Sequence, residues 1–319
     1  MVVGAAWAGL RADAFLFHEL PAVSRTRIRQ KVQAGEALLN GHRFSTSTRL
    51  RAGDRIQIAW RGTPDPGTCP DLEVLYEDGH LMAVNKPAGI ATHPMGRRQA
   101  GTVVQFARRR LQARIRASLE RGDRSFYPTV VNRLDVQTSG IVILALTRGV
   151  HKEMQAMAAA RRVRREYLAL VEGLIREDKG LIDLPIGFDR SSRVRLKMAC
   201  RPDGKESRTR YEVAERFAAH TLARVFPETG RQHQIRVHFA AIGHPVAGDL
   251  LYKDESRFLA DQEQARSPAS LAGAPRPAGR HGLHARRVSF THPVTGAELT
   301  IEAGVPGDLA VMIEAARAE

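Results

Sequence analysis

The chain has 319 residues, of which 43% are hydrophobic, and this is enough to bury the cores of one large domain and one small domain. Its 49 lysines and arginines exceed its 34 aspartates and glutamates, so the formal net charge is +15. This excess favours a polyanionic partner, and we expect nucleic acid because no lipidation signal in the sequence indicates a membrane. A solvated basic surface is the alternative.

Residues 1–62 are expected to form a small basic domain. Residues 13–19 favour a helix, Ser24 is suited to cap the helix that follows it, and residues 56–59 favour a short strand. The second helix carries four basic residues, Arg25, Arg27, Arg29 and Lys31. Proline and glycine give residues 63–70 the composition of a linker, so we place a domain boundary there.

Residues 71–319 are expected to form the larger domain. Strands and helices follow one another there without a regular βαβ alternation, which favours an α+β fold over a doubly wound sheet. Residues 74–86 favour two strands joined by a turn. In residues 101–121 apolar side chains recur at helical spacing, which predicts one amphipathic and very basic helix.

Two further patterns lie in the second half of the chain. Apolar residues alternate with polar ones in residues 194–198, and again in residues 209–213 after an Asp-Gly turn, which predicts a β-hairpin. Residues 254–282 are rich in alanine, arginine, proline and glycine, which is typical of a flexible surface insertion.

Common site patterns are missing from the sequence. It has no P-loop, no G-x-G-x-x-G and no H-E-x-x-H, so nucleotide hydrolysis, dinucleotide redox chemistry and a zincin site have no support. Cys69 and Cys200 lack a C-x-x-C spacing, which fits a reducing cytoplasm. His233 and His238 lie five residues apart in a predicted strand, so they point to opposite faces and no metal site is expected. Beyond the apolar start at residues 1–10, the longest apolar run is residues 141–146, which is too short to cross a bilayer.

One segment places an acid and an arginine on a turn before a strand. Residues 132–140 read N-R-L-D-V-Q-T-S-G and lead directly into the apolar residues 141–146. The turn carries Arg133 and Asp135. Judged by its neighbours alone, an aspartate before Thr-Ser-Gly is most often a backbone cap, so these residues leave a structural role open.

This segment resembles the R-L-D-x-x-T-S-G signature of the RluA-type pseudouridine synthases. Further blocks of that family follow in order: Y-E-D-G-H-L-M-A-V-N-K-P-A-G at 76–89, R-E-Y at 165–167, A-L-V-E-G at 169–173, T-G-R-Q-H-Q-I-R-V-H at 229–238, G-H-P-V-A-G-D at 243–249, L-H-A at 283–285 and F-T-H-P at 290–293. The chain departs from the pattern at Asn132, where histidine is more frequent, and at Gln232, where threonine or serine is usual. The resemblance implies a pseudouridine synthase fold with a central mixed, mainly antiparallel sheet.

The front of the chain resembles a small α/β RNA-binding domain that is shared with a ribosomal small-subunit protein and often precedes these synthases. The resemblance rests on three residue pairs, Ser24-Arg25, Gly35-Glu36 and Asn40-Gly41. An unrelated basic helical cap is the alternative.

The resemblance also implies a chemistry, the isomerisation of uridine to pseudouridine, which adds no atoms and needs no cofactor. It assigns Asp135 as the catalytic carboxylate, and three roles stay open: attack on ribose carbon 1, attack on ring carbon 6, or removal of a ribose proton. It assigns Arg236 as the cation that keeps Asp135 ionised, with phosphate binding as the alternative. Tyr167 would stack on the target base, with a core position on a strand as the alternative.

RNA is the expected partner, and large-subunit ribosomal RNA is expected over transfer RNA. The target uridine has to leave its stack, and Arg133 is suited to fill the gap or to hold a phosphate. Backbone contacts are expected from Ser24, Arg25, Arg27 and Arg231, and from the arginines of residues 101–121 and 161–165.

Two rival functions remain. A non-catalytic RNA-binding ribosome-assembly factor would have little reason to retain Asp135, Tyr167 and Arg236 together. A deaminase needs a zinc signature that the sequence lacks, and a glycosylase would release free uracil.

Overall fold

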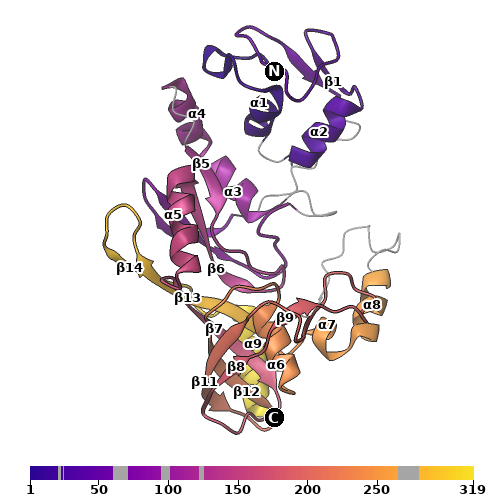
Figure 1. Ribbon diagram of the computed structural model, residues 1–319, viewed down its shortest axis with the longest axis vertical. Coiled ribbons are helices and arrows are strands. Elements are labelled where there is room, and N and C mark those ends of the chain that lie inside the picture. The colour runs from indigo at the N-terminus through magenta and orange to yellow at the C-terminus, as the bar shows by residue number, and fades with distance from the viewer. Residues whose placement is uncertain (21–22, 24, 60–70, 95–100, 122–125, 265–279) are drawn as a thin grey trace. The chain divides into compact units, whose positions relative to one another are not determined.

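The structure is a computed structural model that describes residues 1–20, 23, 25–59, 71–94, 101–121, 126–264 and 280–319 (Figure 1). The chain forms two compact units. The first unit comprises Met1–Lys86, Ile90–Leu134 and Val142–Met154, and the second unit comprises Pro87–Gly89, Asp135–Ile141 and Gln155–Glu319. The predicted linker at 63–70 lies outside the described residues.

The front of the first unit contains the elements that its sequence predicts. A short 3-10 helix at Ala5–Trp7 precedes helices α1 (Ala12–Glu19) and α2 (Arg25–Gln33) and the antiparallel strands β1 (Ala37–Leu39) and β2 (Ile56–Ile58). The helix expected at 13–19 and the strand expected at 56–59 are confirmed, whereas Ser24 lies outside the described residues. Phe15, Leu16, Ile28 and Leu50 are fully buried and form the core of this part.

The rest of the first unit contains β3 (Glu73–Glu77), β4 (Leu81–Lys86), α3 (Val103–Arg110), α4 (Gln112–Glu120), β5 (Phe126–Val130), most of β6 (Ser139–Thr147) and the start of α5 (Arg148–Ala159). Strands β3, β4 and β6 are neighbours, and β5 pairs with β6. The single helix predicted at 101–121 is wrong, because the backbone interrupts it at Leu111 and forms α3 and α4 instead. Thr102 begins α3 in a capping box with Gln105.

The second unit is built on a mixed sheet with the strand order β6-β13-β7-β12-β11-β8. Its strands are β13 (Leu283–Thr291), β7 (Arg164–Glu172), β12 (His220–Pro227), β11 (Arg208–Arg216) and β8 (Lys179–Asp183), and β14 (Glu298–Glu302) pairs with β13. The pairs are antiparallel except that β13 runs parallel to the start of β6. The predicted α+β class with a mixed, mainly antiparallel sheet is therefore confirmed.

Helices cover both faces of this sheet (Figure 1). On one face α9 (Gly307–Ala318) packs through Leu309 and Ile313 against Leu170 and Leu222. On the other face α6 (Gln234–Ala241) packs against β11, where the Phe239 ring lies 5.7 Å from the Tyr211 ring. Tyr211 pairs with Val225, which pairs with Tyr167, so side-chain alternation places Tyr167 on the α6 face.

The β-hairpin predicted from residues 194–198 and 209–213 is wrong. A separate two-stranded sheet joins β9 (Ile186–Phe188) to β10 (Met198–Cys200), and residues 209–213 belong to β11, which pairs with β12 and β8. The segment before β10 is held by Glu255, whose carboxylate accepts hydrogen bonds from the Arg193 backbone amide and from the Lys197 side chain. An alternating pattern does not distinguish these two kinds of partner.

Part of the interval 254–282 is regular or buried. Helix α7 (Leu250–Lys253) is followed by α8 (Glu255–Gln264), and residues 265–279 lie outside the described residues. Arg280 and His281 are only 8% and 4% exposed, so the predicted surface insertion does not extend to them.

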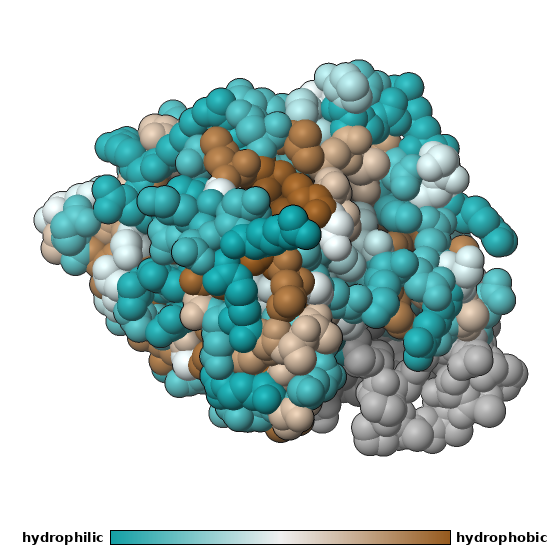
Figure 2. Space-filling model, turned by 90° about the horizontal axis from the view of Figure 1, so that it is seen from below, coloured by the Kyte–Doolittle hydropathy of each residue, from teal (hydrophilic) through white to brown (hydrophobic). Residues whose placement is uncertain are grey.

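Among the described helices, none has the length and apolarity that a bilayer crossing needs. Hydrophilic residues predominate on the face shown in Figure 2, around a smaller apolar area.

Candidate active site

The loop before β6 presents Asp135. The Thr138 amide donates to the Asp135 carbonyl at 3.1 Å, and the Thr138 hydroxyl bonds to His281 Nε2 at 2.8 Å. Gly140 has φ +111, and a Cβ there would lie 2.2 Å from the Ala285 carbonyl oxygen, so this approach of β6 to β13 requires glycine. The Thr-Ser-Gly sequence thus fixes the loop, while the Asp135 side chain remains 29% exposed.

The turn before α6 positions Arg236. Gln234 orders this turn, because its side-chain oxygen accepts from Thr229 Oγ1 at 2.8 Å and from the Arg231 amide at 2.9 Å. Its side-chain nitrogen donates to the Arg208 carbonyl and to Thr209 Oγ1, both at 2.9 Å. The strand predicted around His233 and His238 is wrong, since residues 234–241 form a helix. Both faces of this helix are buried, so its sequence lacks the polar face that marks a surface helix.

Arg236 joins two carboxylates. Its Nη1 lies 2.8 Å from Asp135 Oδ2, while its Nε and Nη2 lie 2.5 and 2.8 Å from the two oxygens of Asp249. The Asp249 side chain is 2% exposed, so it is available to Arg236 and not to a ligand. Asp249 therefore fixes the guanidinium, and the guanidinium fixes Asp135.

The electrostatics of this group keep Asp135 charged. Burial by itself would raise the pKa of Asp135, but the positive charge of Arg236 and its hydrogen bond outweigh that effect and hold the pKa below its usual value. Asp249 behaves in the same way, with its pKa lowered by Arg236 against the effect of burial. Two carboxylates share one guanidinium, so the group carries a net negative charge beside an open face of Asp135.

Aromatic and histidine side chains surround the group. Tyr167 is 8% exposed on β7, and its pKa is raised by burial and by the charge of Asp135. The Arg236 guanidinium lies 5.0 Å from the ring centre of Tyr252, whose hydroxyl bonds to His233 Nδ1 at 2.8 Å. Burial lowers the pKa of His233, so this ring is neutral near pH 7. The site is therefore a group of three charged side chains, two carboxylates and one guanidinium, surrounded by aromatic and histidine side chains.

A second set of contacts, made by Ser139, holds the end of the Asp135 loop. Ser139 Oγ bonds to His284 Nδ1 at 2.8 Å and accepts from Arg280 Nη2 at 2.8 Å. Arg280 also bonds to Asp308 on α9 at 2.7 Å. Burial lowers the pKa of His281 to about 3 and that of His284 to about 4, so both rings are neutral at physiological pH.

The structure brings together the three predicted catalytic residues, whereas most of the predicted RNA-binding residues belong to the first unit. Asp135, Tyr167 and Arg236 all belong to the second unit. Arg231, also in that unit, is exposed and its Nε donates to the Glu206 carbonyl. The remaining candidates lie in the first unit, where Arg133 and Arg27 are exposed and Arg25 lies over the Phe17 ring at 4.4 Å, with Ser24 outside the described residues.

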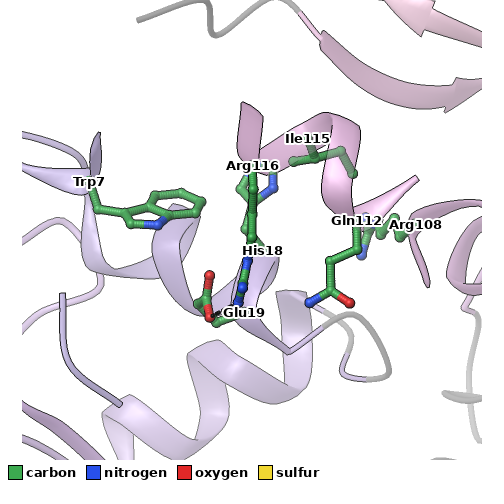
Figure 3. Close-up of a pocket in the computed structure, with 7 residues that line it drawn as sticks. All are labelled: Trp7, His18, Glu19, Arg108, Gln112, Ile115 and Arg116. Atoms are coloured by element: carbon green, nitrogen blue, oxygen red, sulfur yellow. Dashed lines mark hydrogen bonds and ion pairs between the residues drawn. The ribbon is translucent and has the colours of Figure 1, made fainter. Parts of the chain in front are cut away.

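A small cavity in the first unit is unsuited to a substrate (Figure 3). Its lining includes Trp7, His18, Gln112 and the ion-paired Arg116 and Glu19. Its volume of about 10 Å³ is roughly that of one water molecule. In the part of the chain that the structure describes, no histidine, cysteine, aspartate and glutamate side chains are grouped so as to hold a metal ion.

Sequence reasoning missed Asp249, His281 and Tyr252. Asp249 closes the block at 243–249 and therefore stood within a quoted motif, but nothing in its local pattern connects it to Arg236, 13 residues earlier. His281 fell within the predicted insertion and contacts Thr138, 143 residues away in sequence. Only folding brings such pairs together.

Comparisons with known proteins agree on one family. A family profile described as "RNA pseudouridylate synthase" matches residues 80–241. A Xanthomonas campestris protein named ribosomal large subunit pseudouridine synthase D is 37% identical over 97% of this chain and 90% of its own length. A Pseudomonas aeruginosa protein of the same name is 34% identical over 94% and 90%. A Bacillus subtilis protein named uncharacterized RNA pseudouridine synthase YlyB is 34% identical over 95% and 93%.

Two human structures share the fold. RNA pseudouridylate synthase domain containing 4 has a TM-score of 0.54 at 22% identity, and the match covers 77% of this chain and 93% of that one. RNA pseudouridylate synthase domain containing 1 has a TM-score of 0.51 at 23% identity, over 80% and 98%. Since the profile spans half of the chain and relatives above 30% identity span nearly all of it, this chain belongs to the RNA pseudouridylate synthase family, in its RluA-type branch, and is an isomerase.

Proposed function

We propose that this protein converts uridines of large-subunit ribosomal RNA to pseudouridine and that Asp135 is its catalytic carboxylate. The bond between ribose carbon 1 and uracil nitrogen 1 breaks, and ribose carbon 1 then bonds to ring carbon 5. The hydrogen at carbon 5 leaves as a proton, and nitrogen 1 gains one, so the atoms balance.

The observation that carries the proposal is the placement of Asp135 by Arg236. An ionised carboxylate that is partly exposed at the edge of a buried ion-pair network is suited to act on the ribose or the ring. The arginine also prevents the neutralisation that burial would otherwise cause. Tyr167, on the same unit and buried close enough for Asp135 to raise its pKa, supplies an aromatic face for a flipped base.

Two observations support large-subunit ribosomal RNA as the substrate. Several of the relatives are named ribosomal large subunit pseudouridine synthase D, and they align along almost the whole chain. The formal charge of +15 fits a large folded polyanion, since each phosphate contact releases counterions.

The test is tritium release from RNA labelled at carbon 5 of uridine, because bond formation at that carbon expels its hydrogen. Large-subunit ribosomal RNA and transfer RNA are compared with wild type, Asp135→Asn and the control Asp178→Asn, which changes an exposed carboxylate paired with Arg216. We expect release from ribosomal RNA by wild type and by the control, and none by Asp135→Asn.

Each other outcome contradicts part of the proposal. Release by Asp135→Asn would remove Asp135 from the chemistry. Release from transfer RNA alone would assign a different substrate. Tight binding without release from either RNA would favour the ribosome-assembly factor.

A further inference from the structure

Arg165 and Tyr167 lie on the same face of β7, because side chains two residues apart in a strand point the same way. The Arg165 guanidinium reaches the turn that leads into α6. A Cβ added to Gly230 in that turn would lie 3.4 Å from Nη1 and 3.8 Å from Nη2 of Arg165. Arg165 therefore extends along the same surface that presents Tyr167 and Arg236.

Arg165 differs from Arg236 in having no counterion. Its side chain forms no hydrogen bond or ion pair among the residues that the structure describes, and its Nε is buried without an acceptor. Leaving a buried donor unsatisfied destabilises the folded protein. The neighbouring Arg164 is exposed, so water can solvate it. An anion at Arg165 would satisfy the buried donor and balance the charge.

The chemistry of the site identifies that anion. A phosphate offers two oxygens to Nε and one Nη of an arginine in a bidentate pair. Two residues of strand span about 6.6 Å between Cα atoms, so Arg165 and Tyr167 lie close enough for one nucleotide to present its base to Tyr167 and an adjacent phosphate to Arg165. A phosphate at Arg165 is thus one nucleotide step from a base held against Tyr167.

We propose that Arg165 binds the phosphate of the RNA backbone that flanks the uridine being isomerised. This inference rests on the proposed function, because it takes Tyr167 as the site of the flipped base. The Arg165 guanidinium lies at contact distance from Gly230, which places it beside the turn that leads into α6.

The first test measures RNA affinity as a function of salt. Binding of large-subunit RNA fragments is followed by fluorescence anisotropy in an Asp135→Asn background, which prevents turnover, with KCl varied from about 50 to 200 mM. Adding Arg165→Gln should weaken binding about tenfold and lower the slope of log affinity against log salt by about 0.7–0.9, the value of one phosphate contact. Arg317→Gln, which removes an ion-paired charge from α9, should change neither quantity.

The second test replaces the phosphate. RNAs that carry a single uncharged methylphosphonate linkage near the target uridine are compared with normal RNA. At one flanking linkage the neutral group should weaken binding by the protein with Arg165 about tenfold, and Arg165→Gln should show no further loss there. Arg165→Lys should regain part of the affinity, since it keeps the charge and loses the bidentate geometry.

The outcomes separate this inference from the proposed function. With Asp135 restored, Arg165→Gln should raise KM and leave kcat within about threefold, whereas a structural role would lower the melting temperature and kcat together. Unchanged affinity and salt slope in a folded Arg165→Gln, or additive losses at every linkage, would overturn the role of Arg165. If Arg165→Gln does not fold, the methylphosphonate scan with Arg165→Lys decides the question. Absence of tritium release by wild type would instead refute the proposed function.

Discussion

Two buried arginines, one in each unit, are held by different kinds of neighbour. Arg236 is 7% exposed and lies between two carboxylates, whereas Arg108 is 8% exposed and lies over the Phe17 ring at 3.5 Å and the Tyr127 ring at 5.3 Å. Burial lowers the pKa of Arg108 to about 10. The pKa of Arg236 is raised despite burial, because Asp249 and Asp135 stabilise its charge.

Under the proposed function, this difference separates a structural cation from one that serves the chemistry. Arg108 lies over the Phe17 ring of α1 and donates to the Tyr127 hydroxyl of β5, so it joins α3 to these elements without positioning a negative charge. Asp249 fixes the Arg236 guanidinium, and the guanidinium fixes the position of the negatively charged Asp135 carboxylate. Since a buried ion pair adds little net stability compared with apolar packing, its presence at Arg236 favours a catalytic purpose.

Replacing each arginine with methionine should separate the two roles most strongly. Arg236→Met removes the cation that keeps Asp135 ionised and in place, so single-turnover tritium release should slow about a thousandfold, which corresponds to a barrier higher by about 4 kcal/mol. Arg108→Met should keep the rate within about threefold and lower the melting temperature. Equal effects of the two changes on the rate would contradict the comparison.

Asp249→Asn tests whether the second carboxylate acts through Arg236. The variant keeps the size of the side chain but weakens one or two charge-assisted hydrogen bonds, worth roughly 1.5–3 kcal/mol, so kcat should fall about 10- to 100-fold. KM for RNA should change little, because Asp249 does not reach the surface. Asp178→Asn, which changes an exposed carboxylate paired with Arg216, is the control and should leave kcat intact. A rise in KM at constant kcat would assign Asp249 to binding.

The buried histidines of the second unit predict a loss of stability in acid. The folded-state pKa of His281 is about 3, below the unfolded value, so the unfolded chain binds the proton more readily as the pH falls below 6.5. Its contribution to the free energy of unfolding is complete above pH 6.5 and decreases by about 1.4 kcal/mol per pH unit below it.

Urea unfolding at pH 7.5, 6.5 and 5.5 measures this slope. His281→Asn still offers Thr138 a hydrogen bond and should flatten the slope of the free energy of unfolding against pH. His18→Asn should do the same for the first unit, since burial lowers the pKa of His18 to about 4. A slope that neither variant changes would refute the assignment of the lost stability to these rings.

The smallest expected effect concerns the aromatic support of Arg108. Phe17→Leu removes the ring that both Arg25 and Arg108 contact, at 4.4 and 3.5 Å, so urea unfolding should show a loss of about 1–2 kcal/mol. Phe226 also meets two arginines but is only half-buried, and Phe226→Leu should therefore cost less. Neither change should alter kcat, and a slower Phe17→Leu enzyme would connect the first unit to the chemistry.

The sequence indicates three candidate site residues that the structure gathers in one unit, but it does not predict all of the elements that carry them. Asp135, Tyr167 and Arg236 follow from separate motifs, and the structure gathers all three in the second unit. The segment around His233 and His238 was expected to be a strand, and in it Ile235, Val237 and Phe239 alternate with polar residues. All of these positions are buried in a helix, so alternation there does not report a polar face.

Residues that depend on long-range packing escaped prediction. Asp249 and His281 meet Arg236 and Thr138 only after α7 and the strand β13 have packed on the sheet, and no local period records those contacts. The apolar residues keep their helical spacing across Leu111, although the backbone there leaves the helical conformation. The spacing of apolar residues therefore does not reveal the break.

The pH dependence of the single-turnover rate tests the central claim that Arg236 keeps Asp135 ionised and in place. With wild type, the pKa of Asp135 is lowered, so protonation should slow the reaction only below the ordinary aspartate range. In Arg236→Gln the cation is missing, so burial should raise the pKa of Asp135. The fall of the residual rate in acid should therefore begin at a higher pH than in wild type. A limb at the same pH in both proteins would contradict the account.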